Sequence, residues 1–309
     1  MAGIDEAGRG PLAGPVVAAA LIFPAACDML AGVNDSKKLT ARQRETLYDD
    51  VLKQALASGI GVVEASEIDR INILQATYKA MRQALGRLRH QIDHILVDGR
   101  ALPGSIYPQT AIVGGDRTCY SIAAASIVAK VFRDRLMRQL DEVFPNYGFA
   151  QHKGYGTARH LAAIALYKPC PVHRLTFQGV REHLPDFSGT VSTKETGRWG
   201  EHLAAYYLFR HGWRIRQRNY RAGVFGEIDI IAQKGRALAF IEVKTARVGN
   251  FGPPETWVDQ RKATQLGQIA EAWLAEQPEE EYECRFDVIG VSWQNQDIRI
   301  NHVEDAILL

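Results

Sequence analysis

Residues 184–197, LPDFSGTVSTKETG, divide the chain into two blocks. The stretch is rich in Ser, Thr, Gly and Asp, contains a proline and lacks apolar periodicity, which is typical of a linker. A chain of 309 residues is also long enough for two domains, each with its own core. We therefore expect domains at residues 1–185 and 197–309, joined by a linker at 186–196.

Both blocks mix strands with helices. In the first block, short apolar runs predict strands and longer stretches with helical apolar spacing predict helices. The strands are expected at 2–6, 15–23, 59–64 and 94–99, and the helices at 71–88 and 121–140. In the second block, helices are expected at 199–211 and 261–274, and strands at 227–232, 237–243 and 286–291. This order predicts an α/β protein with a mixed sheet in the first domain and a smaller α/β second domain.

The composition excludes several classes of protein. With 46% hydrophobic and 23% charged residues, the chain is neither disordered nor collagen-like. It has no run of about 18 apolar residues, and acids stand where a signal peptide needs a basic region, so we expect a cytoplasmic protein without membrane association. Its four cysteines form no CxxC motif, which argues against a disulfide framework or a cysteine zinc site. Residues 1–185 carry 22 Lys and Arg against 17 Asp and Glu, a mild excess that suits a polyanionic partner.

Acidic residues stand at strand ends in the first block. Asp5 and Glu6 close the opening strand, Asp98 closes another, and Asp116 follows two glycines. Carboxylates from separate segments are the ligands that Mg²⁺ prefers, and two ions about 3.5–4 Å apart would stabilise both the attacking and the leaving oxygen of a phosphodiester. Each acid alone also suits a turn or a helix cap. Asp5 and Glu6 would share a site only if the chain bends between them.

An ordered set of segments makes the first block recognisable. They are Gly3–Val16, Asn34–Leu39, Val97–Gly99, Gly115–Asp116, Ser121–Ile127, Ala129–Val131, Arg133–Arg135, His152–Thr157 and His173–Arg174. With these segments in this order, residues 2–177 resemble the bacterial ribonuclease HII family, which has an RNase H-like fold. The resemblance implies a ribonuclease H that hydrolyses the RNA strand of RNA–DNA hybrids and cuts on the 5′ side of ribonucleotides embedded in duplex DNA. It also implies a metal-activated water, products with 3′-hydroxyl and 5′-phosphate ends, and a monomeric first domain.

The resemblance also assigns roles to individual residues. The four carboxylates that would bind Mg²⁺ or Mn²⁺ and carry catalysis are Asp5, Glu6, Asp98 and Asp116. The residues that would contact the substrate are Gly8, Arg9, Gly10, Lys37 and Tyr155. Of these, the glycine-flanked segment 8–10 would read the ribose 2′-hydroxyl, because a backbone without side chains can approach it closely. Tyr155 would stack on the sugar of the following deoxynucleotide.

Cys170 and His173 are three residues apart. Two ligands are too few for a zinc site, so we expect His173 to pack or to contact phosphate.

The second block has an acid pair followed by a lysine. Asp229 lies on one predicted strand, and Glu242 and Lys244 lie on one face of the next. Glu201, on the first predicted helix, could add a carboxylate. This spacing resembles the PD-(D/E)xK nuclease core, and residues 197–308 resemble the uncharacterised bacterial family UPF0102. The resemblance implies a restriction-endonuclease-like fold and a second candidate site at these four residues, which could bind Mg²⁺ near a scissile phosphate. A surface ion pair with Lys244 would explain the same residues.

Three alternatives stay open at this point. The second domain could be a non-catalytic DNA-binding module that raises the effective concentration of the first domain on nucleic acid. The whole protein could bind hybrids without cutting them. The first domain could also be another nuclease of the RNase H-like fold, although segments 8–10 and 152–157 favour ribose recognition.

Overall fold

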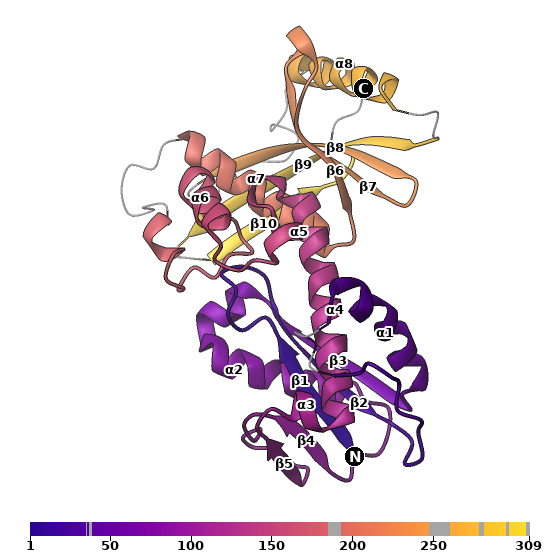
Figure 1. Cartoon of the computed structure of the whole chain (residues 1–309). Helices are drawn as coiled ribbons and strands as arrows, with labels where there is room; N and C mark the ends of the chain where they lie inside the picture. The colour runs from indigo at the N-terminus through magenta and orange to yellow at the C-terminus, as the bar shows by residue number, and fades with distance from the viewer. Residues whose placement is uncertain are drawn as a thin grey trace. The chain divides into compact units, whose positions relative to one another are not determined.

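The computed structural model describes residues 1–34, 36, 39–184, 193–246, 260–277, 281–294 and 297–306. The chain forms two compact units, Met1–Leu184 and Pro185–Leu309, and each has its own five-stranded sheet (Figure 1). Residues 186–192 of the expected linker lie outside the described part, and a helix already begins at Thr193. None of the described helices is long and apolar enough to cross a membrane.

The first sheet has the strand order β3-β2-β1-β4-β5. Its strands are β1 (Ala2–Ala7), β2 (Val16–Ile22), β3 (Ala57–Val63), β4 (Ile95–Asp98) and β5 (Gln109–Ile112). The first three strands are antiparallel neighbours, whereas β4 runs parallel to both β1 and β5. The carboxyl ends of β1, β4 and β5 therefore meet at one edge of the sheet.

Helices cover both faces of this sheet. One face is covered by α2 (Ala65–Gly86), and the other by α1 (Ala41–Gln54) and α4 (Tyr120–Val143). The unit also contains the shorter helices α3 (Gly115–Thr118), α5 (Phe149–His152) and α6 (Ala158–Tyr167). Ile4 belongs to the apolar cluster under α2, and Ala7 belongs to the cluster under α1 and α4. Because side chains alternate along a strand, Asp5 faces α4 and Glu6 faces α2.

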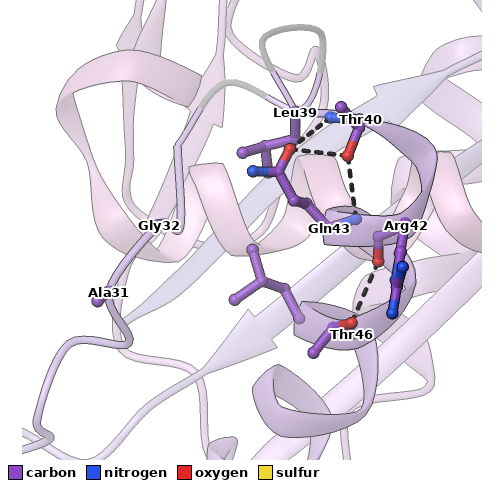
Figure 2. Close-up of a pocket in the computed structure, with 8 residues that line it drawn as sticks. Ala31, Gly32, Leu39, Thr40, Arg42, Gln43 and Thr46 are labelled. Atoms are coloured by element: carbon purple, nitrogen blue, oxygen red, sulfur yellow. Dashed lines mark hydrogen bonds between the residues drawn. The ribbon is translucent and has the colours of Figure 1, made fainter.

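Local sequence signals explain two helix starts. Thr40 and Gln43 form a capping box at the start of α1, beside a pocket that includes Ala31 and Gly32 (Figure 2). In α2, Asn72 has a φ of 66°, and its side chain accepts hydrogen bonds from the N–H groups of Leu74 and Gln75. Asn72 therefore caps the second part of α2, close to the start of the helix expected at 71–88.

The second sheet has the order β10-β9-β8-β7-β6. Its strands are β6 (Arg214–Arg221), β7 (Glu227–Lys234), β8 (Ala237–Ala246), β9 (Glu283–Gln294) and β10 (Asp297–Val303), with helices α7 (Thr193–Arg210) and α8 (Gln260–Ala275). Strands β7 and β8 form an antiparallel hairpin, while β8 and β9 are parallel. Trp273 of α8 packs on Phe240 and Ile231, so an amphipathic helix covers this sheet.

Candidate active site

Two of the predicted carboxylates lie side by side at the edge where parallel strands end. Ile4 of β1 is opposite Val97 of β4, so Asp5 and Asp98 each follow by one residue. Asp5 is only 5% exposed, because it lies between the sheet and α4. The strand-end placement expected from the sequence therefore brings these two acids together.

Burial and neighbouring charge both oppose ionisation of Asp5. Burial raises the pKa of Asp5 well above its usual value, and the charges of Glu6 and Asp98 raise it further. A hydrogen bond with Ser126 of α4 partly offsets this rise. Carboxylates that repel one another in a buried setting form a site that a cation would stabilise.

Asp116 reaches the same edge through a glycine turn. Gly114 has a φ of 69°, and the N–H of Gly115 donates to Asp98 Oδ1 at 2.7 Å. A Cβ on Gly115 would lie 2.6 Å from Ile122 Cδ1, so a larger residue here would displace the buried Ile122 side chain. Asp116 follows directly and is 4% exposed. One hydrogen bond thus ties the segment that carries Asp116 to Asp98.

Glu6 is placed differently from the other three acids. The register of β1 with β2 is unbroken through Ala7, so the chain does not bend between Asp5 and Glu6. Glu6 instead pairs with Arg9 at 3.2 Å. Within the described ranges, no three His, Cys, Asp or Glu side chains already form an arrangement that could hold a metal ion. The donor chemistry nevertheless fits Mg²⁺ or Mn²⁺, because the acids here are oxygen donors whose mutual repulsion a divalent cation would offset.

The segment expected to read ribose lies next to the expected stacking residue. Arg9 and Gly10 are exposed after β1, and a Cβ built on Gly10 would lie 3.8 Å from the ring of Tyr155. Tyr155 is 45% exposed, so its ring is available to a ligand. The structure therefore brings residues 8–10 and Tyr155 together, while Lys37 lies outside the described residues.

Two buried histidines connect Tyr155 to the interior. His160 Nδ1 lies 2.9 Å from the carbonyl oxygen of Tyr155, and His160 Nε2 lies 3.0 Å from His173 Nε2. The N–H of Cys170 donates to His173 Nδ1 at 3.0 Å. Because His173 is only 1% exposed, its expected packing role is confirmed and a direct phosphate contact is not possible. The spacing of Cys170 and His173 reflects this internal bond.

The second unit brings its candidate residues together as well. The N–H of Val243 donates to Asp229 Oδ2 at 2.7 Å, and Lys244 Nζ donates to Glu242 Oε1 at 2.9 Å. Glu242 is 7% exposed, so this ion pair is not an ordinary surface pair. The sequence pattern did not indicate Lys262 of α8, whose Nζ lies 3.1 Å from Glu242 Oε2.

Three carboxylates of this second cluster influence one another. Burial raises the pKa of Asp229 to about 7, and the charges of Glu242 and Glu201 contribute further. Burial also raises the pKa of Glu201, while Arg218 lowers it. Glu201 therefore lies near the β7–β8 acids, as expected from its position on the first helix of this unit.

The sheet order and the acids at its edge define the class of the first unit, an RNase H-like nuclease. The crystal structure of the ribonuclease H2 from Pyrococcus horikoshii OT3 is 30% identical, with a TM-score of 0.52, and the match covers 59% of this chain and 95% of that one. The model of the family described as ribonuclease HII matches residues 2–180. The chain belongs to the ribonuclease HII family and is a ribonuclease H enzyme.

Curated relatives agree with this assignment. A ribonuclease HII of Geotalea daltonii is 58% identical over 189 residues, which are 61% of this chain and 87% of the relative. A ribonuclease HII of Syntrophotalea carbinolica is 58% identical over 184 residues, which are 60% of this chain and 88% of the relative. In the second unit, residues 200–291 match the uncharacterised protein family UPF0102. Both resemblances noted in the sequence are therefore confirmed.

Proposed function

We propose that the first unit hydrolyses the RNA strand of RNA–DNA hybrids and cuts on the 5′ side of single ribonucleotides in duplex DNA. The observation that carries the proposal is the gathering of Asp5, Asp98 and the segment of Asp116 at one edge of the sheet. The expected products end in 3′-hydroxyl and 5′-phosphate. The unit would act in the cytoplasm as a monomer.

Asp5, Glu6, Asp98 and Asp116 would hold Mg²⁺ or Mn²⁺, which supplies Lewis-acid activation of a water and stabilises the leaving oxygen. For Glu6 to join them, it would leave its pair with Arg9, and the chain would bend between Asp5 and Glu6, which lie on opposite faces of β1. The bond from Gly115 to Asp98 restrains the carboxylate and keeps Asp116 beside it. Burial keeps bulk water from Asp5 and strengthens its interactions with positive charge.

The substrate would be selected at the neighbouring surface. Gly10 leaves room beside the Tyr155 ring, so a sugar can lie against both the exposed backbone and the aromatic face. A 2′-hydroxyl is the group that separates RNA from DNA at such a site. Arg9, which is exposed, and Lys37 are suited to phosphate contacts, which position the strand without specifying it.

An RNA–DNA hybrid with a labelled RNA strand tests this proposal. Asp98→Asn should abolish cleavage in Mg²⁺ or Mn²⁺ and leave hybrid binding largely intact. Asp93→Asn makes the same chemical change at an exposed residue before β4 and should leave cleavage unchanged. Cleavage that persists in Asp98→Asn would refute the assignment, and tight binding without cleavage by the unmodified protein would support the binding-only alternative.

We also propose that the second unit is a DNA nuclease. The supporting observation is the buried Glu242, held by Lys244 and Lys262 next to Asp229. In the Asp98→Asn protein, cleavage of an all-DNA duplex should be lost on Glu242→Ala and kept on Glu283→Gln, which changes an exposed glutamate of the same unit. Absence of any DNA cleavage, together with weaker DNA binding after removal of residues 190–309, would favour the non-catalytic tether.

A further inference from the structure

A buried arginine, Arg174, binds backbone carbonyl oxygens of the segment that follows β1. Arg174 Nη1 donates to the carbonyl oxygen of Arg9 at 2.7 Å, and Nη2 donates to the carbonyl oxygen of Gly8. Nε and Nη2 donate to the carbonyl oxygen of Gly14 at 3.1 and 3.0 Å. Arg174 is about 165 residues away in sequence, so the segment is held by the far end of the first unit.

Arg174 is buried without a direct ion pair among the described residues. It is 0% exposed, and none of the ion pairs of the described ranges includes it. Burial lowers its pKa to about 9, with a smaller contribution from Arg133, while the charge of Asp69 acts in the opposite direction. The group therefore stays protonated at neutral pH. A guanidinium has only donors, and here they are directed at three backbone carbonyls of one loop. Burying a charge is costly unless it is hydrogen-bonded, and these bonds to the loop offset that cost.

The hydrogen bonds from Arg174 to two successive carbonyls fix the direction of two N–H groups. No cis peptide bond occurs in the described chain, and in a planar trans peptide the C=O and the N–H point in opposite directions. The peptide that carries the carbonyl of Gly8 also carries the N–H of Arg9, and the next peptide joins the carbonyl of Arg9 to the N–H of Gly10. With both carbonyls turned inward to Arg174, both N–H groups face away from it. Arg9 and Gly10 are exposed, so these donors lie on the substrate side.

We propose that Arg174 is a positioning residue for ribose recognition. By holding the carbonyls of Gly8 and Arg9, it turns the N–H groups of Arg9 and Gly10 toward the 2′-hydroxyl of the substrate. This role rests on the proposed reading of ribose by residues 8–10. Arg133 holds the remainder of the loop in the same way, through the carbonyls of Ala13 and Pro15, but does not bond the two carbonyls that orient the exposed donors.

Binding by the full chain separates this role from general stabilisation. In the Asp98→Asn protein, the dissociation constant is measured for a duplex with one ribonucleotide and for the same duplex in DNA only, and the ratio gives the ribose preference. Adding Arg174→Lys keeps the charge but loses the forked set of donors. The ribose preference should fall about tenfold, the contribution of about one well-oriented hydrogen bond. Affinity for the all-DNA duplex should stay within about twofold, because phosphate contacts dominate it.

Two further variants distinguish the proposed role of Arg174 from a general loss of folding. Phe177→Leu removes the ring on which the guanidinium lies, 5.1 Å from its centroid, and should reduce the ribose preference less than Arg174→Lys does. Leu85→Ala weakens the core under α2 and should leave the preference unchanged in protein that remains folded. An unchanged preference in both Arg174→Lys and Phe177→Leu refutes the role of Arg174. No preference in Asp98→Asn alone refutes the ribose reading itself.

Discussion

Gly8→Ala tests whether the loop after β1 is as tightly built as the structure indicates. Gly8 has a φ of +97°, and a side chain in this region costs about 1–2 kcal/mol. The new Cβ would lie 2.1 Å from Arg133 Nε and 2.8 Å from the carbonyl oxygen of Pro15. Arg133 cannot yield freely, because it is fully buried and bonds three carbonyls. Relief of this overlap adds about 1–3 kcal/mol, and one lost hydrogen bond adds about 1 kcal/mol.

The expected loss of unfolding free energy is therefore about 3–6 kcal/mol, with a parallel loss of ribonuclease activity. Gly104→Ala is the matched control, since Gly104 has a φ of +67° but no atom within 4 Å of its added Cβ. It should cost only about 1–2 kcal/mol, the cost of the left-handed backbone.

Urea unfolding measures both variants with an internal reference. All five tryptophans lie in the second unit, at Trp199, Trp213, Trp257, Trp273 and Trp293. Far-UV circular dichroism follows both units, so Gly8→Ala should shift the dichroism transition while the tryptophan fluorescence transition stays in place. Equal effects of Gly8→Ala and Gly104→Ala would refute the steric part of the reasoning.

Three other predictions concern acid stability, helix capping and the second site. Burial, more than any other cause, lowers the pKa of His160 to about 4 and of His173 to about 3. Both stay neutral in the folded state, so their contribution to stability is complete above about pH 6.5 and is lost as the pH falls. The two histidines should contribute about 3–4 kcal/mol less to the stability of the first unit at pH 5 than at pH 7. Denaturation at both pH values measures this loss, and equal stability in the wild-type protein and in a His160→Gln, His173→Gln variant at both pH values would contradict it. Thr40→Ala should cost about 1 kcal/mol in the same assay through the lost cap of α1, and no change would show that the cap contributes nothing. Glu242→Gln should lower the pKa of Asp229 from about 7, because it removes a neighbouring negative charge, while burial keeps the pKa above its usual value. Carboxyl NMR measures this pKa, and an unchanged value would show that Glu242 does not influence Asp229.

The strand-end acids were predictable from sequence because local pattern and sheet geometry act together. The apolar run 94–99 marks a buried strand, and Asp98 closes it where parallel strands end at one edge. Strand β5 was missed, since its residues QTAI are short and only partly buried. Without β5, the sequence did not show how Asp116 reaches Asp98, which depends on a single bond from Gly115.

The buried cations could not be predicted from local sequence. Arg133 and Arg174 resemble ordinary surface arginines. The carbonyls of the β1–β2 loop that they bind lie more than 100 residues away in sequence. Lys262 of the second unit stands at the start of an amphipathic helix, where a basic residue is usually solvated, yet it reaches Glu242 of β8. In each case the partner is set by tertiary packing, which a periodic pattern does not contain.

We propose that a water held near the strand-end carboxylates attacks the phosphodiester on the 5′ side of a ribonucleotide. The most direct measurement is the chemistry of both new ends after cleavage of duplex DNA that contains one ribonucleotide, in Mg²⁺ or Mn²⁺. We expect an upstream fragment with a free 3′-hydroxyl, which a polymerase can extend, and a downstream fragment with a 5′-phosphate on the ribonucleotide. A cut on the 3′ side that leaves a 2′,3′-cyclic phosphate would contradict it, because the 2′-hydroxyl would then be the nucleophile.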